Sequence, residues 1–198
     1  VMNIGESAAE EMVLDIIKSQ TNPTIASFAG AGRVIFRITA KAENIEKCRE
    51  LIDPVKDELI RRFGIENAYL VESGNVEDKV AQLLLERNLT VSVAESLTGG
   101  LVASRLINYP GISKSFLEGF VTYSNEAKMR ALNVRRETLE NYGAVSEETA
   151  REMAYGAAFF SGSDIGASTT GIAGPDGGSK EKPVGLVYVC VYYDGKYE

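Results

Sequence analysis

The pattern of apolar residues changes near residue 75, and the pattern beyond that point is the strongest constraint on the fold. Short, almost wholly apolar runs alternate there with segments whose apolar residues recur at helical spacing. Such runs are typical of strands buried on both faces, so helices must cover both faces of the sheet. We therefore predict a three-layer α/β/α sandwich for residues 75–198. The expected strands are 90–94, 116–123, 165–169 and 184–192, and the expected helices are 76–86, 101–107, 125–132, 137–142 and 147–160.

Residues 1–74 are predicted to form a separate, small α+β domain. The polar stretch 72–75 is its expected boundary. Pro54 falls inside a long helical pattern, so we expect it to kink or split that helix. The expected elements are a helix over 6–18, two strands joined at 30–32, a helix from about 44 and a short strand at 68–71.

Histidine is absent from all 198 residues. A Ser-His-Asp triad, a Cys-His pair and a His-ligated metal are therefore excluded, and a catalytic base must be Lys, Tyr, Asp or Glu. The net charge of −7 works against the phosphate attraction on which binding to long nucleic acids depends. Cys48 and Cys190 lack metal-type spacing, and we interpret them as small buried residues rather than a disulfide or zinc site.

The sequence shows neither a membrane span nor a secretory signal. No apolar stretch approaches the roughly 18 residues of a spanning helix. The N-terminal residues VMNIGESAAEEM do not combine a basic segment with an apolar one. We therefore expect a cytoplasmic protein with no membrane partner.

In a parallel sheet, ligands collect at the carboxyl ends of the strands, and three strand ends here carry unusual residues. The first is VSVAESLTGG, residues 91–100, in which Ser96 follows a buried strand. The small residues Thr98, Gly99 and Gly100 then let backbone amides approach a ligand. Ser96 is either a nucleophile or an N-cap of the following helix.

The second strand end is VTYSNEAK, residues 121–128. Ser124 is a plausible N-cap there, whereas Tyr123 and Lys128 are either functional or simply solvated side chains. The third is TTGIAGPDGGSKEKP, residues 169–183, which is too long for a simple turn. It resembles a phosphate-binding loop but fails the P-loop pattern, so kinase or ATPase chemistry loses its main support.

Four blocks resemble the C-terminal domain of the CinA family (competence/damage-inducible protein), which is the nicotinamide mononucleotide deamidase family. The blocks are VAESLTGG, GFVTYSNEAK, GAVSEETA and TGIAGPDGGSKEKPVG, in the order of the family. The first seventy-odd residues, with GESAAEEM and SQTNPTIA, resemble the KH-type linker domain that precedes this module. The expected domains are thus a KH-type domain over 1–74 and a deamidase domain over 75–198.

The resemblance implies an amidohydrolase that converts nicotinamide mononucleotide to nicotinic acid mononucleotide and ammonia, with no metal and no other cofactor. The family's catalytic serine, tyrosine and lysine match Ser96, Tyr123 and Lys128. We expect Ser96 to attack the carboxamide and a neutral Lys128 to accept its proton. Tyr123 would orient Lys128 or relay the proton through its hydroxyl. Backbone amides from Thr98 to Gly100 would bind the oxyanion.

Further residues are candidates for substrate binding. Glu95 either holds a ribose hydroxyl or accepts hydrogen bonds from backbone amides, and the second role is slightly favoured. Asn125 either binds the substrate's amide or simply begins its helix. A glycine-rich turn makes an anion nest, so the phosphate is expected at the third strand end. The residues expected to bind it are Thr170, Gly171, Ile172, Ala173 and Gly174.

Relative to the family pattern, the sequence lacks the larger N-terminal domain, the expected partner of these two domains. It also stops after a hairpin turn at 194–195, before the family's final strand and helix. A non-catalytic nucleotide-binding or assembly module is therefore the alternative function. The hairpin at Gly30 to Arg33 departs from the G-x-x-G loop of RNA-binding KH domains, so nucleic acid is an unlikely partner. We expect a scaffolding role for this domain and a homodimer.

Overall fold

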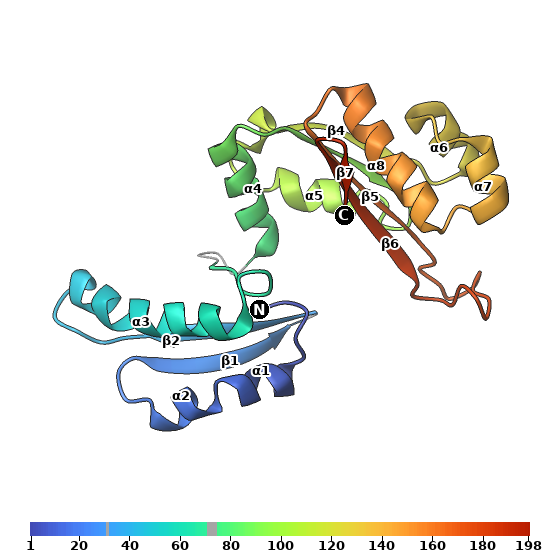
Figure 1. Ribbon diagram of the computed structural model, residues 1–198. Helices are drawn as coiled ribbons and strands as arrows, with labels where there is room; N and C mark the ends of the chain where they lie inside the picture. Colours follow the sequence, from blue (N-terminus) through green and yellow to red (C-terminus); the bar gives the residue numbers. More distant parts are fainter. Residues whose placement is uncertain (31, 71–74) are drawn as a thin grey trace. The chain divides into compact units, whose positions relative to one another are not determined.

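The computed structural model describes residues 1–30, 32–70 and 75–198 (Figure 1). The described chain separates into two compact units, 1–76 and 77–198. The expected boundary at residues 72–75 lies largely outside the described residues. No helix within the described ranges is long and apolar enough to span a lipid bilayer.

Unit 1–76 is built on an antiparallel hairpin, as predicted. Strand β1 (Thr24–Gly30) pairs with β2 (Arg33–Thr39) along their whole length. The expected helix over 6–18 is two helices, α1 (Glu6–Met12) and α2 (Leu14–Ser19). The break falls at Val13, which is fully buried beside Ala9 in the core of this unit. The expected strand at 68–71 is wrong for residues 68–70, which form no strand, and Val71 lies outside the described residues.

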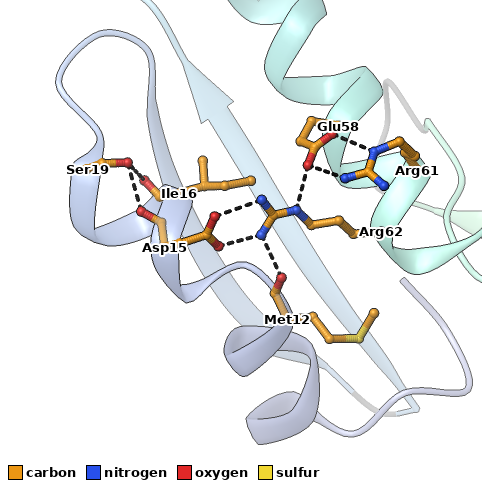
Figure 2. Close-up of polar contacts among 7 residues, drawn as sticks. All are labelled: Met12, Asp15, Ile16, Ser19, Glu58, Arg61 and Arg62. Carbon is orange, nitrogen blue, oxygen red and sulfur yellow. Dashed lines mark hydrogen bonds and ion pairs between the residues drawn. The ribbon is translucent and has the colours of Figure 1, made fainter.

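Helix α3 (Ile45–Phe63) packs on the hairpin and passes through Pro54 without a break, so the expected split is wrong. Pro54 cannot donate to the carbonyl of Glu50, but both residues are exposed, and water can satisfy that carbonyl. Figure 2 shows how α3 is tied to α2: the Arg62 guanidinium forms an ion pair with Asp15 and also donates to the Glu58 carboxylate.

Unit 77–198 contains a five-stranded sheet in the order β4-β3-β5-β6-β7. Strand β3 runs parallel to both of its neighbours, β4 and β5, whereas β6 and β7 are antiparallel additions. The carboxyl ends of β4, β3 and β5 therefore meet at one edge of the sheet. The strands are β3 (Val91–Glu95), β4 (Phe116–Val121), β5 (Ile165–Gly171), β6 (Val187–Tyr193) and β7 (Lys196–Tyr197).

Helices cover both faces of this sheet, which confirms the predicted three-layer sandwich. Side chains alternate along β3, so Val93 faces α5, whereas Ala94 packs with Met153 of α8. Helices α6 and α7 pack against α8 (Figure 1). The helices are α4 (Val76–Arg87), α5 (Leu101–Ile107), α6 (Asn125–Leu132), α7 (Arg136–Tyr142) and α8 (Glu147–Ser161), with a short 3-10 helix η1 (Ile112–Lys114).

The contact between α8 and β5 depends on a glycine. A Cβ atom built on Gly166 would lie 1.9 Å from the carbonyl oxygen of Ala154 in α8. Only a residue without a side chain lets helix and strand approach this closely. The small residues Ala150, Ala154 and Ala157 of α8 are also buried, so the helix lies directly on the sheet.

Candidate active site

Ser96 is the first residue after β3, and its amide extends the pairing with β5 by donating to the carbonyl of Thr169 at 3.0 Å. The chain then turns sharply into α5. Gly99 and Gly100 have φ angles of 59° and 99°, which favour glycine, and they allow the turn to close within four residues. Ser96 is buried at 8% exposure. Its hydroxyl is therefore held by a rigid strand end rather than by a mobile loop.

Lys128 contributes the second polar group from α6, whose first turn is capped by the side chain of Ser124. The Lys128 side chain is 1% exposed, which is exceptional for a lysine. Its Nζ atom lies 3.0 Å from the hydroxyl oxygen of Ser96 and also contacts the carbonyl oxygens of Thr122 at 2.8 Å and Tyr123 at 3.2 Å. Burial lowers the pKa of Lys128.

The three neighbours of Lys128 determine how a neutral amine would be oriented. A carbonyl oxygen can only accept a hydrogen bond, whereas a hydroxyl can donate or accept. A neutral amine would therefore use its two N–H groups on Thr122 and Tyr123 and direct its lone pair at the hydroxyl of Ser96. Within the described part of the chain, no carboxylate forms an ion pair with Lys128 that would hold it charged.

Glu95, the residue before Ser96, is 1% exposed and binds backbone amides. Its carboxylate accepts hydrogen bonds from Gly100, Val102 and Ala103 at 2.8 to 3.0 Å. Burial alone would raise the pKa of Glu95, but these amides and the Thr98 hydroxyl outweigh it, so the pKa is lowered. The second of the two expected roles is therefore the one observed, and no ribose contact is needed to explain this acid.

Tyr123 does not occupy the position expected of a proton relay. Its side chain is 74% exposed, and its contact with Lys128 is made by the main-chain carbonyl. The tyrosine thus orients the lysine, but not through its hydroxyl. Asn125 is exposed at the start of α6, next to the capping Ser124.

In the turn after Ser96, the amides that could bind an oxyanion are not all the expected ones, Thr98 to Gly100. The amide of Gly99 donates to the carbonyl of Ser96, and the amide of Gly100 donates to Glu95. Neither amide is therefore available to a ligand. The amides of Leu97 and Thr98 have no acceptor among the residues that the structure describes. The Thr98 hydroxyl lies 2.6 Å from that of Thr169.

The third strand end also differs from the expected anion nest. The hydroxyl of Thr170 donates to the carbonyl of Ala144 at 2.6 Å, and the amide of Ile172 donates to Leu186. A Cβ on Gly171 would lie 2.7 Å from the carbonyl oxygen of Leu186, so this glycine serves the close pairing of β5 with the incoming loop. Thr170 and Ile172 are therefore structural. Ala173 and Gly174 lie beyond this pairing, and Ala173 is exposed.

Sequence reasoning missed three residues that complete these contacts. Thr122 offers its carbonyl to Lys128, and Thr169 offers its carbonyl to the amide of Ser96. Lys182, in the loop after β5, donates to the carbonyls of Tyr142 and Val145. Main-chain carbonyls carry no residue-specific signal, so only the position of Thr122 and Thr169 at strand ends pointed to the first two.

A cavity of about 520 Å³ lies elsewhere in this unit, lined by residues of α8, of α6 and the segment after it, and of β7. Arg151, Tyr155, Phe159 and Tyr197 are among its lining residues. None of the predicted site residues lines this cavity. The candidate site at Ser96 is instead defined by the hydrogen bonds that join Ser96 and Lys128 to their neighbours.

Comparison with known proteins places both units in one family. A family model described as the CinA C-terminal domain matches residues 73–198, and one described as the damage-inducible protein CinA KH domain matches residues 1–67. A competence-damage inducible protein of Clostridium acetobutylicum is 58% identical over 196 residues, and one of Clostridioides difficile is 56% identical over 202 residues. These matches cover 99% and 98% of this chain but 47% and 48% of the relatives, so the chain spans about half their length.

Solved structures agree with the sequence comparison. The competence/damage inducible protein CihA from Agrobacterium tumefaciens matches with a TM-score of 0.59 and 42% identity, covering 66% of this chain and 81% of its own. A CinA superfamily protein from Escherichia coli matches with a TM-score of 0.61 and 35% identity, covering 66% and 78%. Because the C-terminal family model alone matches more than half of the chain, this protein belongs to the CinA family.

Proposed function

We propose that this chain is an amidohydrolase that converts nicotinamide mononucleotide to nicotinic acid mononucleotide and ammonia, using Ser96 and a neutral Lys128. The single observation that carries the proposal is the contact between the buried Lys128 amine and the Ser96 hydroxyl at 3.0 Å. The choice of substrate rests on family membership and on the four sequence blocks rather than on a bound molecule.

The first half of the proposed reaction forms an acyl-enzyme. The Ser96 oxygen attacks the carboxamide carbon, and its proton passes to the Lys128 Nζ. The resulting oxyanion would be bound by the amides of Leu97 and Thr98, at the residues directly following the nucleophile. The carbon–nitrogen bond then breaks, and the leaving nitrogen takes the proton from Lys128 to depart as ammonia.

The second half releases the product. Water attacks the ester carbon, gives a proton to Lys128, and the carbon–oxygen bond to Ser96 breaks. Ser96 regains its proton from Lys128, and the carboxylic acid that forms loses the second proton of the water to solvent and leaves as a carboxylate. Lys128 alternates between amine and ammonium in both halves, and the carbonyls of Thr122 and Tyr123 can accept hydrogen bonds from either form.

The test is to incubate the purified chain with nicotinamide mononucleotide and to measure ammonia and nicotinic acid mononucleotide. Ser96→Ala and Lys128→Met should each reduce kcat by at least about 100-fold, because each removes one half of the nucleophile–base pair. Ser104→Ala on α5 and Lys114→Met in η1 are matched controls at exposed positions and should keep normal activity.

The outcomes separate the proposal from its alternatives. Turnover that survives in Ser96→Ala would rule out the covalent route. Binding of the nucleotide without product in the wild-type chain would favour a nucleotide-binding or assembly module. Hydroxylamine added during turnover should divert the acyl-enzyme to a hydroxamate, which direct attack by water on the amide would not produce.

A further inference from the structure

Lys182 is a cation held in place by carbonyl groups rather than by an acid. Its ammonium donates to the carbonyl oxygens of Tyr142 at 2.6 Å and Val145 at 2.7 Å. Within residues 77–198, no carboxylate forms an ion pair with it. An ammonium has three N–H groups, so one of them and the full positive charge are left for a ligand.

The backbone of Lys182 is also fixed. Its amide donates to the hydroxyl of Ser179 at 3.0 Å, and its carbonyl accepts from the amide of Ser179 at 2.7 Å. Both ends of this long side chain are thus constrained before any ligand arrives. Such preorganisation lowers the entropic cost of binding, which distinguishes Lys182 from an ordinary surface lysine.

A short chain of contacts places this ammonium at the same edge of the sheet as Ser96. The Ser96 amide donates a hydrogen bond to the carbonyl of Thr169. The hydroxyl of the next residue, Thr170, donates one to the carbonyl of Ala144. Ala144 immediately precedes Val145, whose carbonyl holds Lys182. Three hydrogen bonds and short backbone segments therefore join the nucleophile to the cation.

We propose that Lys182 binds the phosphate monoester end of the substrate and so makes the site prefer a nucleotide to a nucleoside. This inference rests on the proposed function for the identity of the reacting end. Two of the donors first expected to bind the phosphate, the Thr170 hydroxyl and the Ile172 amide, are occupied by protein carbonyls. An ammonium with a free N–H supplies both the charge and the hydrogen bond that a phosphate requires.

The experiment compares nicotinamide mononucleotide with nicotinamide riboside, which lacks only the phosphate. We expect Lys182→Gln to lower the ratio of kcat/KM for nucleotide over riboside by about 10- to 100-fold, mainly through KM. Lys180→Gln, at an exposed lysine in the same loop, is the matched control and should leave the ratio unchanged. Lys182→Arg keeps the charge and should restore most of the preference.

A purely structural role for Lys182 gives a different result. Loss of the bonds to Tyr142 and Val145 would then reduce activity on both substrates equally and leave their ratio intact. That outcome, or an unchanged ratio at normal activity, would overturn the inference. Thermal unfolding of Lys182→Gln shows whether the variant is folded. If it is not, the ratio of kcat/KM for nucleotide over riboside is compared between Lys182→Arg and the wild type instead.

Failure of the proposed function is detected separately. If the wild-type chain turns over neither substrate, titration calorimetry with inorganic phosphate and with nicotinamide mononucleotide still tests the cation. Binding that weakens about 10-fold or more in Lys182→Gln, but not in Lys180→Gln, supports a phosphate site without the proposed reaction. Equal binding by the wild type, Lys182→Gln and Lys180→Gln, or no binding by the wild type, would refute the phosphate site as well as the proposed reaction.

Discussion

Glu95 and Ser96 are consecutive residues whose side chains serve opposite sides of the same strand end. The Glu95 carboxylate binds the amides that begin α5, whereas the Ser96 hydroxyl contacts Lys128 of α6. Alternation along an extended backbone produces this division. Glu95 therefore fixes the turn that follows Ser96, and Ser96 presents its hydroxyl to the Lys128 amine, the contact on which the proposed reaction depends.

The rate of the proposed reaction should rise with pH and then level off. Lys128 must be neutral to accept a proton, and burial places its pKa below the ordinary value of 10.5. The plateau of log kcat/KM should therefore begin below pH 10.5. Lys128→Arg should be inactive at every pH, because a guanidinium does not deprotonate in proteins. A rate that falls as the pH rises toward 10.5 would contradict the assignment of Lys128 as the base.

The same group should make stability depend on pH. Between the lowered pKa of folded Lys128 and 10.5, the unfolded chain binds more protons than the folded one. The free energy of unfolding must therefore rise with pH across that window. Urea unfolding at several pH values should show this rise in the wild type and a smaller one in Lys128→Met. Identical slopes for both proteins would mean that the pKa of Lys128 is not lowered.

Glu95→Gln should destabilise unit 77–198 by about 1–3 kcal/mol, because it weakens charge-assisted bonds to the amides of Gly100, Val102 and Ala103. Glu118→Gln on β4 changes an exposed acid and is the matched control. The pKa of folded Glu95 is lowered, so its contribution is present above the ordinary value of 4.5 and is lost as pH falls through the folded pKa. Urea unfolding at pH 7 and pH 3 measures both effects, and equal stability of the two variants at pH 7 would contradict the prediction.

Tyr123→Phe should keep kcat within about threefold of the wild type. The substitution removes an exposed hydroxyl and leaves the carbonyl that holds Lys128 unchanged. Steady-state assays with nicotinamide mononucleotide provide the measurement, with Lys128→Met as the inactive reference. A loss approaching that of Lys128→Met would restore the proton-relay role for the phenol and show that the side chain turns inward with substrate bound.

Gly166→Ala should destabilise the fold by about 1–3 kcal/mol, because the added Cβ would meet the carbonyl of Ala154 at 1.9 Å. Gly119→Ala in β4 is the comparison, since its Cβ would lie 3.3 Å from the Cβ of Ala103 and requires only a small adjustment. Chemical unfolding of both variants tests the order of their effects. A smaller loss for Gly166→Ala than for Gly119→Ala would show that α8 shifts easily on the sheet.

Most elements of the fold could be predicted from the sequence because apolar spacing is a local property. Helix α5 was predicted at its observed ends, and β5 was predicted with only its last two residues missed. The errors have tertiary causes. The helix over 6–18 breaks where Val13 enters the core, and α3 runs through Pro54 because that side of the helix faces water.

The sequence by itself determined the strand ends, the absence of histidine and the two side chains, Ser96 and Lys128, on which the proposed chemistry depends. The tertiary structure alone decided that these two groups, 32 residues apart, lie 3.0 Å from each other. It also decided that Glu95, Thr170 and Tyr123 act on or through backbone groups. The physical reason is that main-chain amides and carbonyls are the same at every position, so their partners emerge only when the chain folds.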